Sequence, residues 1–505
     1  MSNKQPNILL LFTDQQRFDT IAALGNPLIK TPALDRLCTE GTAFTRCYTP
    51  SPVCVPARMA LASGRAPQQT GIFDLWDQGP TPLPESLMDR LAGHGYQTHG
   101  VGKMHFVPDS IAPWGFHSRD RSEEGDANPA TNDYRKYLDD QGYGHVREPQ
   151  GVRSEMYYVP QPAQMPDRLH HSTWTGDRSI DFINHRDSSK PFFLWTSFVK
   201  PHPPFANPDP WHKLYRTKEM PAPKRYDGDQ ALLTYWNHVQ NRYKYRDAGQ
   251  DLLFLRTMRA AYYASISHID YQIGRILETL GDEIDNTLIL FSSDHGELLG
   301  DYGSVGKRCM LDAAARVPMI ARLPGRFDAG GRCDEPTTLL DIFPTCIAVA
   351  GDNDKPSTEG EDLVDVASGK ADGRVVTSAF RSNGYGLYMS ASKTGKYIYS
   401  EPDQKQWFFD HTQDPHETSP LEGHPETDHL KTELVTRFKR DGYTTPFEGD
   451  DWRTYPKRSI SEDPDDGLLY QDDPDIQARI NKLGPYARRV TIDDRESYKL
   501  LQPPN

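Results

Sequence analysis

The chain has 505 residues and a formal net charge of −14 at pH 7, with 36% hydrophobic and 25% charged residues. Its length suggests two to four domains, and its acidic charge argues against a general nucleic-acid-binding protein, which needs a basic surface. The longest apolar runs fall short of the roughly 18 residues that a membrane-spanning helix requires, so we expect no membrane span. The run from residue 7 to residue 13 ends in Asp14 and lacks a small-residue cleavage site. We therefore expect a strand rather than a signal peptide, and a cytoplasmic protein, or a periplasmic or secreted one if a leader has been removed.

Strand-like and helix-like segments alternate along the first three quarters of the chain. The predicted strands are residues 8–13, 97–102, 191–199, 286–291 and 317–321. The predicted helices are residues 33–40, 86–94, 179–185, 252–280 and 339–350. This order predicts an α/β fold with a large, mostly parallel central sheet that helices cover on both faces.

Two long polar segments, residues 106–175 and 207–250, interrupt this alternation. Loops of this length within a domain are usually functional or poorly ordered. We interpret both segments as covers over the active face of the sheet.

The pattern of predicted elements changes after about residue 372. Short strand patterns follow one another closely at residues 375–380, 386–392, 396–400 and 407–410. They predict a small antiparallel domain over residues 373–505, after a catalytic domain over residues 1–372. An acidic, Pro-rich tail begins near residue 441 and contains an amphipathic piece at 476–483. The tail is either a solvated extension or an arm that joins subunits of a homo-oligomer.

The segment from Ser51 to Arg65 concentrates an unusual amount of chemistry. Pro56 suits the first position of a helix, which would place Cys54 just outside the helix N-terminus. Free backbone N–H groups and the helix dipole favour an anion there, and Arg58 would add a fork of donors. This pattern fits a nucleophile beside an oxyanion site, or equally a small buried cysteine before an ordinary helix. None of the six cysteines has CxxC spacing, which argues against a structural zinc site.

Polar side chains follow four of the predicted strands at their carboxyl ends, where open α/β sheets place their sites. These residues are Asp14, Lys103, His105, His202, Asp294 and His295. Each one alone is ordinary, because a lone Asp is more often a helix cap and a lone His more often a structural residue. Their shared placement is what favours a common site.

Together with Cys54-Val-Pro-Ala-Arg58 and Ser63-Gly-Arg65, these residues resemble the type I sulfatases of the alkaline-phosphatase-like superfamily, whose signature cysteine becomes formylglycine. Further family-like segments follow in family order: Gly102-Lys-Met-His105, Ser293-Asp-His-Gly-Glu297, Gly306-Lys307 and Leu340-Asp-Ile-Phe-Pro-Thr345. The resemblance implies a large α/β domain and a smaller C-terminal α+β domain with a four-stranded antiparallel sheet. It also implies a formylglycine-generating or anaerobic maturation enzyme as a partner.

The resemblance assigns a site for one divalent cation. Its ligands would be Asp14, Asp294, His295, the modified side chain of Cys54 and the amide oxygen of Gln15. Oxygen-rich ligation favours Ca²⁺, with Mg²⁺ or Mn²⁺ as alternatives. Many members carry a second aspartate in place of Gln15 and an asparagine in place of His295. The variants seen here resemble choline sulfatases and phosphonate monoester hydrolases.

The resemblance also implies a catalytic cycle. A hydroxyl of the hydrated formylglycine attacks sulfur while Asp294 accepts its proton. Arg58, Lys103 and Lys307 balance the charge on the other oxygens. His202, or Lys307 near it, protonates the leaving alcohol, and His105 removes the second hydroxyl proton to release sulfate.

The sequence thus predicts hydrolysis of a sulfate monoester, most simply of a sulfated carbohydrate. The alternatives are a phosphonate monoester or phosphodiester hydrolase, an aryl or choline sulfatase, and a non-catalytic binder of sulfated glycans on the same fold. We expect a sulfated small molecule or oligosaccharide as the partner. Candidate substrate contacts in the covers and beyond are His170, His171, Trp174, Trp211 and Arg308.

Overall fold

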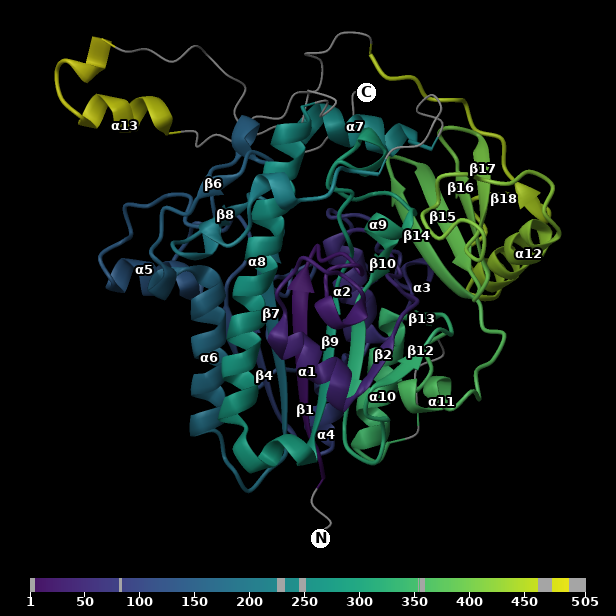
Figure 1. The fold of residues 1–505 in the computed structure, drawn as a ribbon, viewed down its shortest axis with the longest axis horizontal. Helices are drawn as coiled ribbons and strands as arrows, with labels where there is room; N and C mark the ends of the chain where they lie inside the picture. Colours follow the sequence, from purple (N-terminus) through teal and green to yellow (C-terminus); the bar gives the residue numbers. More distant parts are fainter. Residues whose placement is uncertain are drawn as a thin grey trace.

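The computed structural model describes residues 5–80, 84–224, 232–244, 251–352, 354, 359–461 and 475–489 (Figure 1). A large sheet with helices around it carries a smaller antiparallel sheet at one side. No helix among these residues is long and apolar enough to cross a membrane. Predictions that concern residues 462–474 and 490–505 of the tail lie outside the described residues.

The central sheet has eight strands in the order β12-β2-β11-β9-β1-β7-β4-β5. At its middle, β1 (Asn7–Asp14) lies parallel to both β7 (Phe192–Pro201) and β9 (Thr287–Ser293). β4 (Gln97–Gly102) and β5 (Ser118–Arg121) continue the parallel part on one side. On the other side only β11 (Met319–Arg322) runs against its neighbours, between β9 and β2 (Thr42–Phe44), and β12 (Gly331–Cys333) closes that edge. The large and mostly parallel sheet is therefore confirmed.

Alternate side chains of β1 explain why both faces of the sheet are covered. Ile8, Leu10 and Phe12 pack with α2 (Cys54–Ser63), α4 (Leu87–Gly93) and α10 (Ile342–Val349). Leu9 and Leu11 pack on the opposite face with α1 (Pro32–Glu40), α6 (His171–His185) and α8 (Leu252–Thr279). Because successive side chains of a strand point to opposite faces, a continuous apolar run is what a doubly covered strand needs.

The predicted elements differ from the observed ones mainly at their ends. The helix predicted at 179–185 in fact begins at His171. The sequence does not reveal this earlier start, because the first two turns consist of polar and aromatic residues with no clear apolar period. The strand predicted at 317–321 is divided at Pro318 into β10 (Arg316–Val317) and β11, since proline cannot donate to a strand ladder. The helix predicted at 339–350 begins with a short 3₁₀ turn before α10.

The two covers contain more structure than their composition indicates. The first includes β5, α5 (Asp133–Asp140) and β6 (Gln161–Pro162), and the second includes β8 (Ala206–Asn207) and α7 (Tyr235–Lys244). β6 and β8 pair in parallel, so the two covers contact each other.

The smaller sheet has four antiparallel strands in chain order, as expected. They are β14 (Val376–Ser382), β15 (Tyr385–Ala391), β16 (Gly395–Ser400) and β17 (Lys405–Asp410). One face packs on α12 (Pro425–Arg440), a helix that the sequence did not predict. The other face packs on residues of the first part of the chain, around Tyr48 and Val53. The division of the chain at residue 372 stays a prediction.

In the tail, α13 (Ile476–Lys482) coincides with the predicted amphipathic piece. It lies at the far edge of the molecule from the small sheet, beyond α5 and β6 (Figure 1). An ion pair from Arg147 to Asp475, the N-cap of α13, at 3.2 Å connects this helix to the first cover.

Candidate active site

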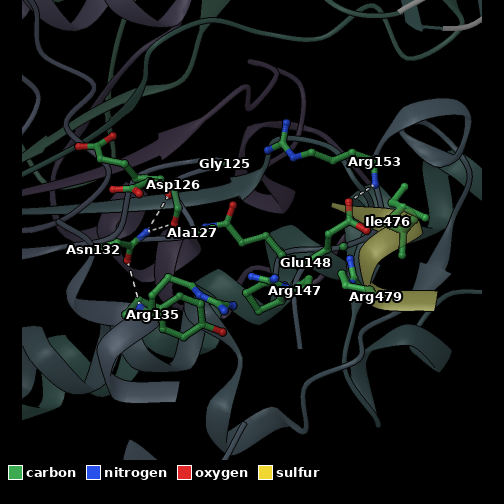
Figure 2. A pocket seen from close by; sticks show the side chains of 16 residues that line it. Gly125, Asp126, Ala127, Asn132, Arg135, Arg147, Glu148, Arg153, Ile476 and Arg479 are labelled. Atoms are coloured by element: carbon green, nitrogen blue, oxygen red, sulfur yellow. Dashed lines mark hydrogen bonds between the residues drawn. The ribbon is translucent and has the colours of Figure 1, made fainter. Parts of the chain in front are cut away.

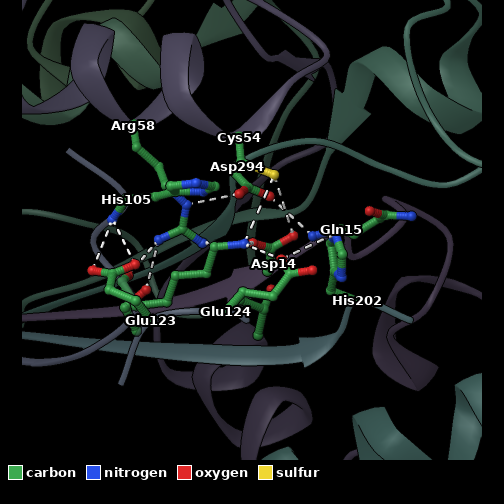
Figure 3. Close-up of polar contacts among 12 residues, drawn as sticks. Asp14, Gln15, Cys54, Arg58, His105, Glu123, Glu124, His202 and Asp294 are labelled. Atoms are coloured by element: carbon green, nitrogen blue, oxygen red, sulfur yellow. Dashed lines mark hydrogen bonds and ion pairs between the residues drawn. The ribbon is translucent and has the colours of Figure 1, made fainter. Parts of the chain in front are cut away.

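The carboxyl ends of β1, β4, β7 and β9 meet at one edge of the sheet, and the N-terminus of α2 faces them. Asp14 ends β1, Lys103 follows β4, His202 follows β7, and Asp294 follows β9. All four side chains are buried. The structure thus brings together the polar residues that the sequence places at strand ends, and Cys54 lies among them (Figure 3).

Cys54 differs from the sequence prediction in its position on the helix. Val53 is the N-cap, so Cys54 is the first residue of α2 and Pro56 the third. Pro56 still lies in the first turn, where an N–H has no intrahelical acceptor, so the proline costs the helix nothing.

Cationic and basic groups surround the Cys54 sulfur. Its Sγ lies 2.8 Å from Lys307 Nζ, 3.2 Å from His295 Nε2 and 3.9 Å from Lys103 Nζ. Burial opposes ionisation, but Lys103, Lys307 and His295 hold the pKa of the Cys54 thiol well below its ordinary value. The other cysteines with a resolved shift have raised pKa values, because burial dominates there. Position 54 is therefore built for an anionic group.

Arg58 organises the carboxylates beneath this position. Its Nε donates to Asp294 Oδ2 at 2.8 Å, and its Nη2 lies 3.2 Å from Asp14 Oδ2. Nη1 donates to the Lys103 carbonyl oxygen at 2.6 Å and to Ser197 Oγ at 2.8 Å. Because all three of its guanidinium nitrogens contact protein groups, Arg58 fixes the two aspartates.

The two aspartates have opposite pKa shifts. Burial and the neighbouring Asp14 raise the pKa of Asp294. Burial also acts against ionised Asp14, but Lys103, His202 and Arg58 bring its pKa below the ordinary value. Lys103 Nζ contacts Asp14 Oδ2 at 2.7 Å.

Asp14, Cys54, Asp294 and His295 could together hold a metal ion, since one ligand atom of each lies within 4.8 Å of the others. His295 Nδ1 lies 3.0 Å from the Gly296 carbonyl, a contact that needs a proton on Nδ1 and leaves Nε2 as a ligand. Gln15 fits as well. Its Nε2 donates to Glu297, while its Oε1 is buried without a hydrogen-bond partner. The donor set is rich in oxygen and suits a hard divalent cation.

Backbone geometry at the strand ends supports this arrangement. Gln15 and His105 have φ values of 66° and 55°, which non-glycine residues seldom adopt and which cluster at functional sites. Gly102 has φ +87°, and a Cβ there would lie 2.0 Å from the Ser197 carbonyl oxygen. Only glycine allows β4 to approach β7 this closely just before Lys103.

Two acidic residues that the sequence did not single out belong to the site. Glu124 contacts Lys103 Nζ at 2.8 Å and lies 3.4 Å from His202 Nε2. Glu123 accepts hydrogen bonds from the backbone N–H groups of Met104 and His105 at 3.0 and 3.1 Å. Both lie in the first cover, and no spacing or motif in that polar segment distinguishes them from its other acids.

The two histidines near Cys54 are held differently. His202 is buried, and its Nδ1 lies 2.7 Å from the Pro203 carbonyl oxygen. Burial lowers the pKa of His202 to about 4 against the opposing charge of Glu124. A hydrogen bond from His105 is among the causes that lower the Cys54 pKa.

Three of the five candidate substrate contacts are packed inside the protein, which corrects the expectation for them, whereas Trp211 and Arg308 stay predictions. His170, His171 and Trp174 are at most 3% exposed, because the start of α6 is packed inside the protein. The Trp211 indole donates to Asp167 and stacks on His268. Arg308 pairs with Asp74 at 3.1 Å and lies over the Phe380 ring.

Comparison with known proteins agrees with this geometry. The sulfatase family model matches residues 6–352, and the model described as "N-sulphoglucosamine sulphohydrolase, C-terminal" matches residues 300–442. An arylsulfatase of Clostridium perfringens is 31% identical over 488 residues, covering 87% of this chain and 96% of the relative.

Solved structures share the fold. The phosphonate monoester hydrolase of Agrobacterium radiobacter has a TM-score of 0.72 at 22% identity, over 87% of this chain and 96% of that one. A protein solved with its substrate D-glucosamine-2-N,6-O-disulfate has a TM-score of 0.67 at 20% identity, over 88% and 98%. The family match over residues 6–352 spans more than half of the chain, and the arylsulfatase similarity nearly all of its relative. The chain therefore belongs to the sulfatase family and is a sulfuric ester hydrolase.

Proposed function

We propose that this enzyme hydrolyses a sulfate monoester of a carbohydrate through a formylglycine made from Cys54. The surroundings of position 54 carry the proposal: two lysine ammonium groups, an imidazole and an arginine-held pair of aspartates converge there. An ordinary hydroxyl nucleophile, such as a serine, would form a sulfate ester that needs an external water to break. The hydrated aldehyde instead supplies one hydroxyl that attacks sulfur and a second whose deprotonation expels sulfate.

Asp14, Asp294, His295, the residue at 54 and Gln15 would hold a divalent cation. We propose Ca²⁺, with Mg²⁺ or Mn²⁺ as alternatives, because oxygen atoms predominate among the ligands. The bound cation would withdraw charge from the sulfate oxygens and make the attacking hydroxyl more acidic.

The chain's own residues supply the remaining chemistry. Asp294 accepts the proton of the attacking hydroxyl, since its Oδ1 and Oδ2 lie in the cluster around position 54. Lys103 and Lys307 bind the equatorial oxygens of the sulfate. Arg58 holds the two aspartates and the Lys103 backbone, so that the lysine ammonium groups stay directed at the sulfate.

Lys307 would deliver the proton to the leaving alcohol. His202 is the alternative donor, but its lowered pKa makes its protonated form scarce near neutral pH. His105 has its backbone N–H fixed by Glu123 and serves as the base for the second hydroxyl.

A sulfated carbohydrate is the substrate class we favour. The solved relative with D-glucosamine-2-N,6-O-disulfate shows that this fold can bind a sulfated sugar. An aryl or choline sulfate is the alternative within the same reaction. Hydrolysis of a phosphonate monoester or phosphodiester is the alternative reaction. We keep it as the main alternative to sulfate ester hydrolysis because the fold is shared with the Agrobacterium phosphonate monoester hydrolase.

The decisive variant is Cys54→Ala, assayed with an aryl sulfate after production alongside a maturation enzyme. We expect a loss of kcat of about a thousandfold or more, because the nucleophile is removed while the small, buried side chain is replaced by one that fits. Mass spectrometry of the peptide containing residue 54 in the unsubstituted protein should show the aldehyde in place of the thiol. Multiple turnover by the alanine variant would refute the proposal.

The wild-type kcat/KM for an aryl sulfate should exceed that for the matching aryl phosphonate. A clear preference for the phosphonate would establish the alternative reaction. Comparison of sulfated mono- and oligosaccharides then tests the substrate class.

A further inference from the structure

A cavity of about 360 Å³ lies beside the active site, between the first cover and α13 of the tail (Figure 2). Four arginines contribute to its lining, three from the cover and one from the tail: Arg135, Arg147, Arg153 and Arg479. Its volume falls within the range of small-ligand pockets, roughly 300–1,000 Å³.

The cavity shares a wall with the candidate active site. Glu123 lines the cavity, and the same carboxylate holds the backbone of His105. Arg153, also in the lining, pairs with Glu124 at 2.6 Å, and Glu124 contacts Lys103 Nζ at 2.8 Å. Two ion pairs thus connect the cavity lining to the lysine next to Cys54, so the cavity adjoins the position where the sulfate would react.

Donors of the protein already engage the acidic groups in the lining. Glu123 accepts two backbone N–H groups of the Lys103–Phe106 turn. Asp126 accepts from the Thr131 hydroxyl at 2.6 Å, and Glu148 accepts from the backbone N–H of Arg153 at 2.9 Å. These carboxylates are thus held in place by the cover itself.

Arg135 has no such compensation. Its side chain is 5% exposed, and its guanidinium donates only to backbone carbonyls, to Val146 at 2.7 Å and Gly144 at 3.4 Å. Its Nε has no hydrogen-bond partner, and no carboxylate in the described part of the chain forms an ion pair with it. Arg135 and Arg147 both line the cavity (Figure 2). A buried guanidinium without a counter-charge is costly, and a bound anion would offset that cost.

We propose that this cavity is a subsite for a second anionic group, a carboxylate or a further sulfate, on the leaving-group side of the substrate. The inference rests on the proposed sulfatase function and narrows its substrate to an acidic, multiply charged oligosaccharide. Guanidinium forks match the paired oxygens of either group. Aryl and choline esters carry no second anion, so for them the arginines would have no role.

The tail takes part in this specificity. Ile476 and Arg479 of α13 form the wall opposite the cover, and the pair between Arg147 and Asp475 holds the helix at the cavity. The amphipathic piece of the tail therefore contributes to the substrate site of its own chain.

The test is a binding titration by calorimetry in the Cys54→Ala background, so that no turnover disturbs it. Three ligands are compared: a sulfated disaccharide with an added carboxylate, one with an added sulfate, and one with a neutral hydroxyl at that position. The measured quantity is the affinity for an anionic ligand divided by the affinity for the neutral ligand. We expect Arg479→Ala to lower this ratio by about tenfold, since one charge-assisted contact is lost. Lys482→Ala removes a charge from the same helix outside the cavity and should leave the ratio unchanged.

Arg135→Gln is the second variant, and its thermal stability is checked first because the side chain is buried. It should lower the same ratio at least as much. The carboxylate and sulfate ligands together show which anion the subsite prefers. An unchanged ratio in both arginine variants, or an equal fall in the lysine control, overturns the subsite.

The two proposals can fail separately. If the mature enzyme hydrolyses sulfate esters but the affinity ratio does not respond to the arginines, only the subsite is wrong. If the ratio responds but the mature enzyme hydrolyses no sulfate ester, the subsite stands as an anion site and the proposed sulfatase function is wrong.

Discussion

The hydrogen bonding of Gln15 supports its proposed role as a metal ligand. Its amide nitrogen is committed to Glu297, a residue that also accepts from Tyr158 at 3.1 Å and from the backbone of Leu299. The amide oxygen is thereby left as an acceptor without a donor inside the protein. A buried oxygen in this state gains more from a cation than one that would first have to give up a hydrogen bond.

Replacing Gln15 by leucine should therefore weaken binding of the divalent cation. We expect roughly a tenfold increase in the dissociation constant, in the range seen when metal-supporting residues are removed. Isothermal titration of metal-free protein with Ca²⁺ measures it. Gln16→Leu is the matched control, because Gln16 is the next residue, is equally buried and donates to Thr20 instead. A larger effect in the Gln16 variant would contradict our assignment of the ligand.

At the scale of elements, the end of β7 is tied to the first cover by a lysine. Lys200 Nζ donates to the Gln150 carbonyl at 2.9 Å, to the His202 carbonyl at 3.2 Å and to the Pro204 carbonyl. The lysine joins a strand that carries a site residue to a segment that lines the cavity. Burial, with repulsion from Arg153, lowers the pKa of Lys200 from 10.5 to about 7.

This pKa shift predicts how stability changes with pH. Between pH 7 and pH 10.5 the unfolded chain binds a proton at Lys200 that the folded chain releases, so its contribution to the free energy of unfolding rises with pH. The contribution is least favourable below pH 7, where both states are protonated. In Lys200→Met this rise is absent, and the variant also lacks the hydrogen bonds that Lys200 donates. Thermal melts of both proteins between pH 7 and pH 9 should show a growing advantage of the wild type, whereas parallel curves would contradict the shift.

The sequence predicts a helix or strand well where the burial of its own side chains determines the element. It predicts poorly where contacts with distant segments determine where the element begins. The strand at 8–13 is apolar throughout because both of its faces are covered, and this pattern is visible in the sequence. The start of α6 at His171 is held by contacts with α8 and the covers, so local spacing does not reveal it. The same contrast holds within the site. Asp14 and Asp294 can be found from their strands, but Glu124 enters through the fold of the cover.

At the scale of the whole molecule, a buried ionic cluster joins the small sheet to the main sheet. Lys396 of β16 is fully buried and contacts Asp312, in α9 (Asp312–Ala315), and Glu417. His411 lies 3.0 Å from Glu417 and also contacts Arg46. Asp312, His411 and Glu417 have the spacing of a metal group, but the ammonium of Lys396 contacts both carboxylates. The ammonium group of Lys396 therefore balances the charge of these carboxylates, as a bound metal cation would.

Lys396→Met should consequently lower the melting temperature and loosen the small sheet. Removing one partner from a buried ion-pair network costs about 3–5 kcal/mol. Asp312 keeps its pair with Arg316 at 2.9 Å, and Glu417 keeps its contact with His411. Calorimetry measures the loss, and limited proteolysis should reveal earlier cleavage beyond residue 375. Lys405→Met, an exposed lysine on the neighbouring strand, is the control and should melt like the wild type. Equal melting of all three proteins would mean that the cluster does not hold the two sheets together.

The burial of Cys54 has a consequence for the order of events during synthesis. Only 2% of this residue is exposed. Its Sγ faces the edge of the sheet and contacts the ammonium groups of Lys103 and Lys307. A second enzyme could not reach the Cβ of residue 54 once these elements have closed over it. The proposed maturation therefore competes in time with folding, and the maturation enzyme must recognise the segment as an extended chain. Cells that fold this chain faster than they modify it would accumulate a stable, inactive thiol form that no later treatment with the maturation enzyme could rescue without unfolding.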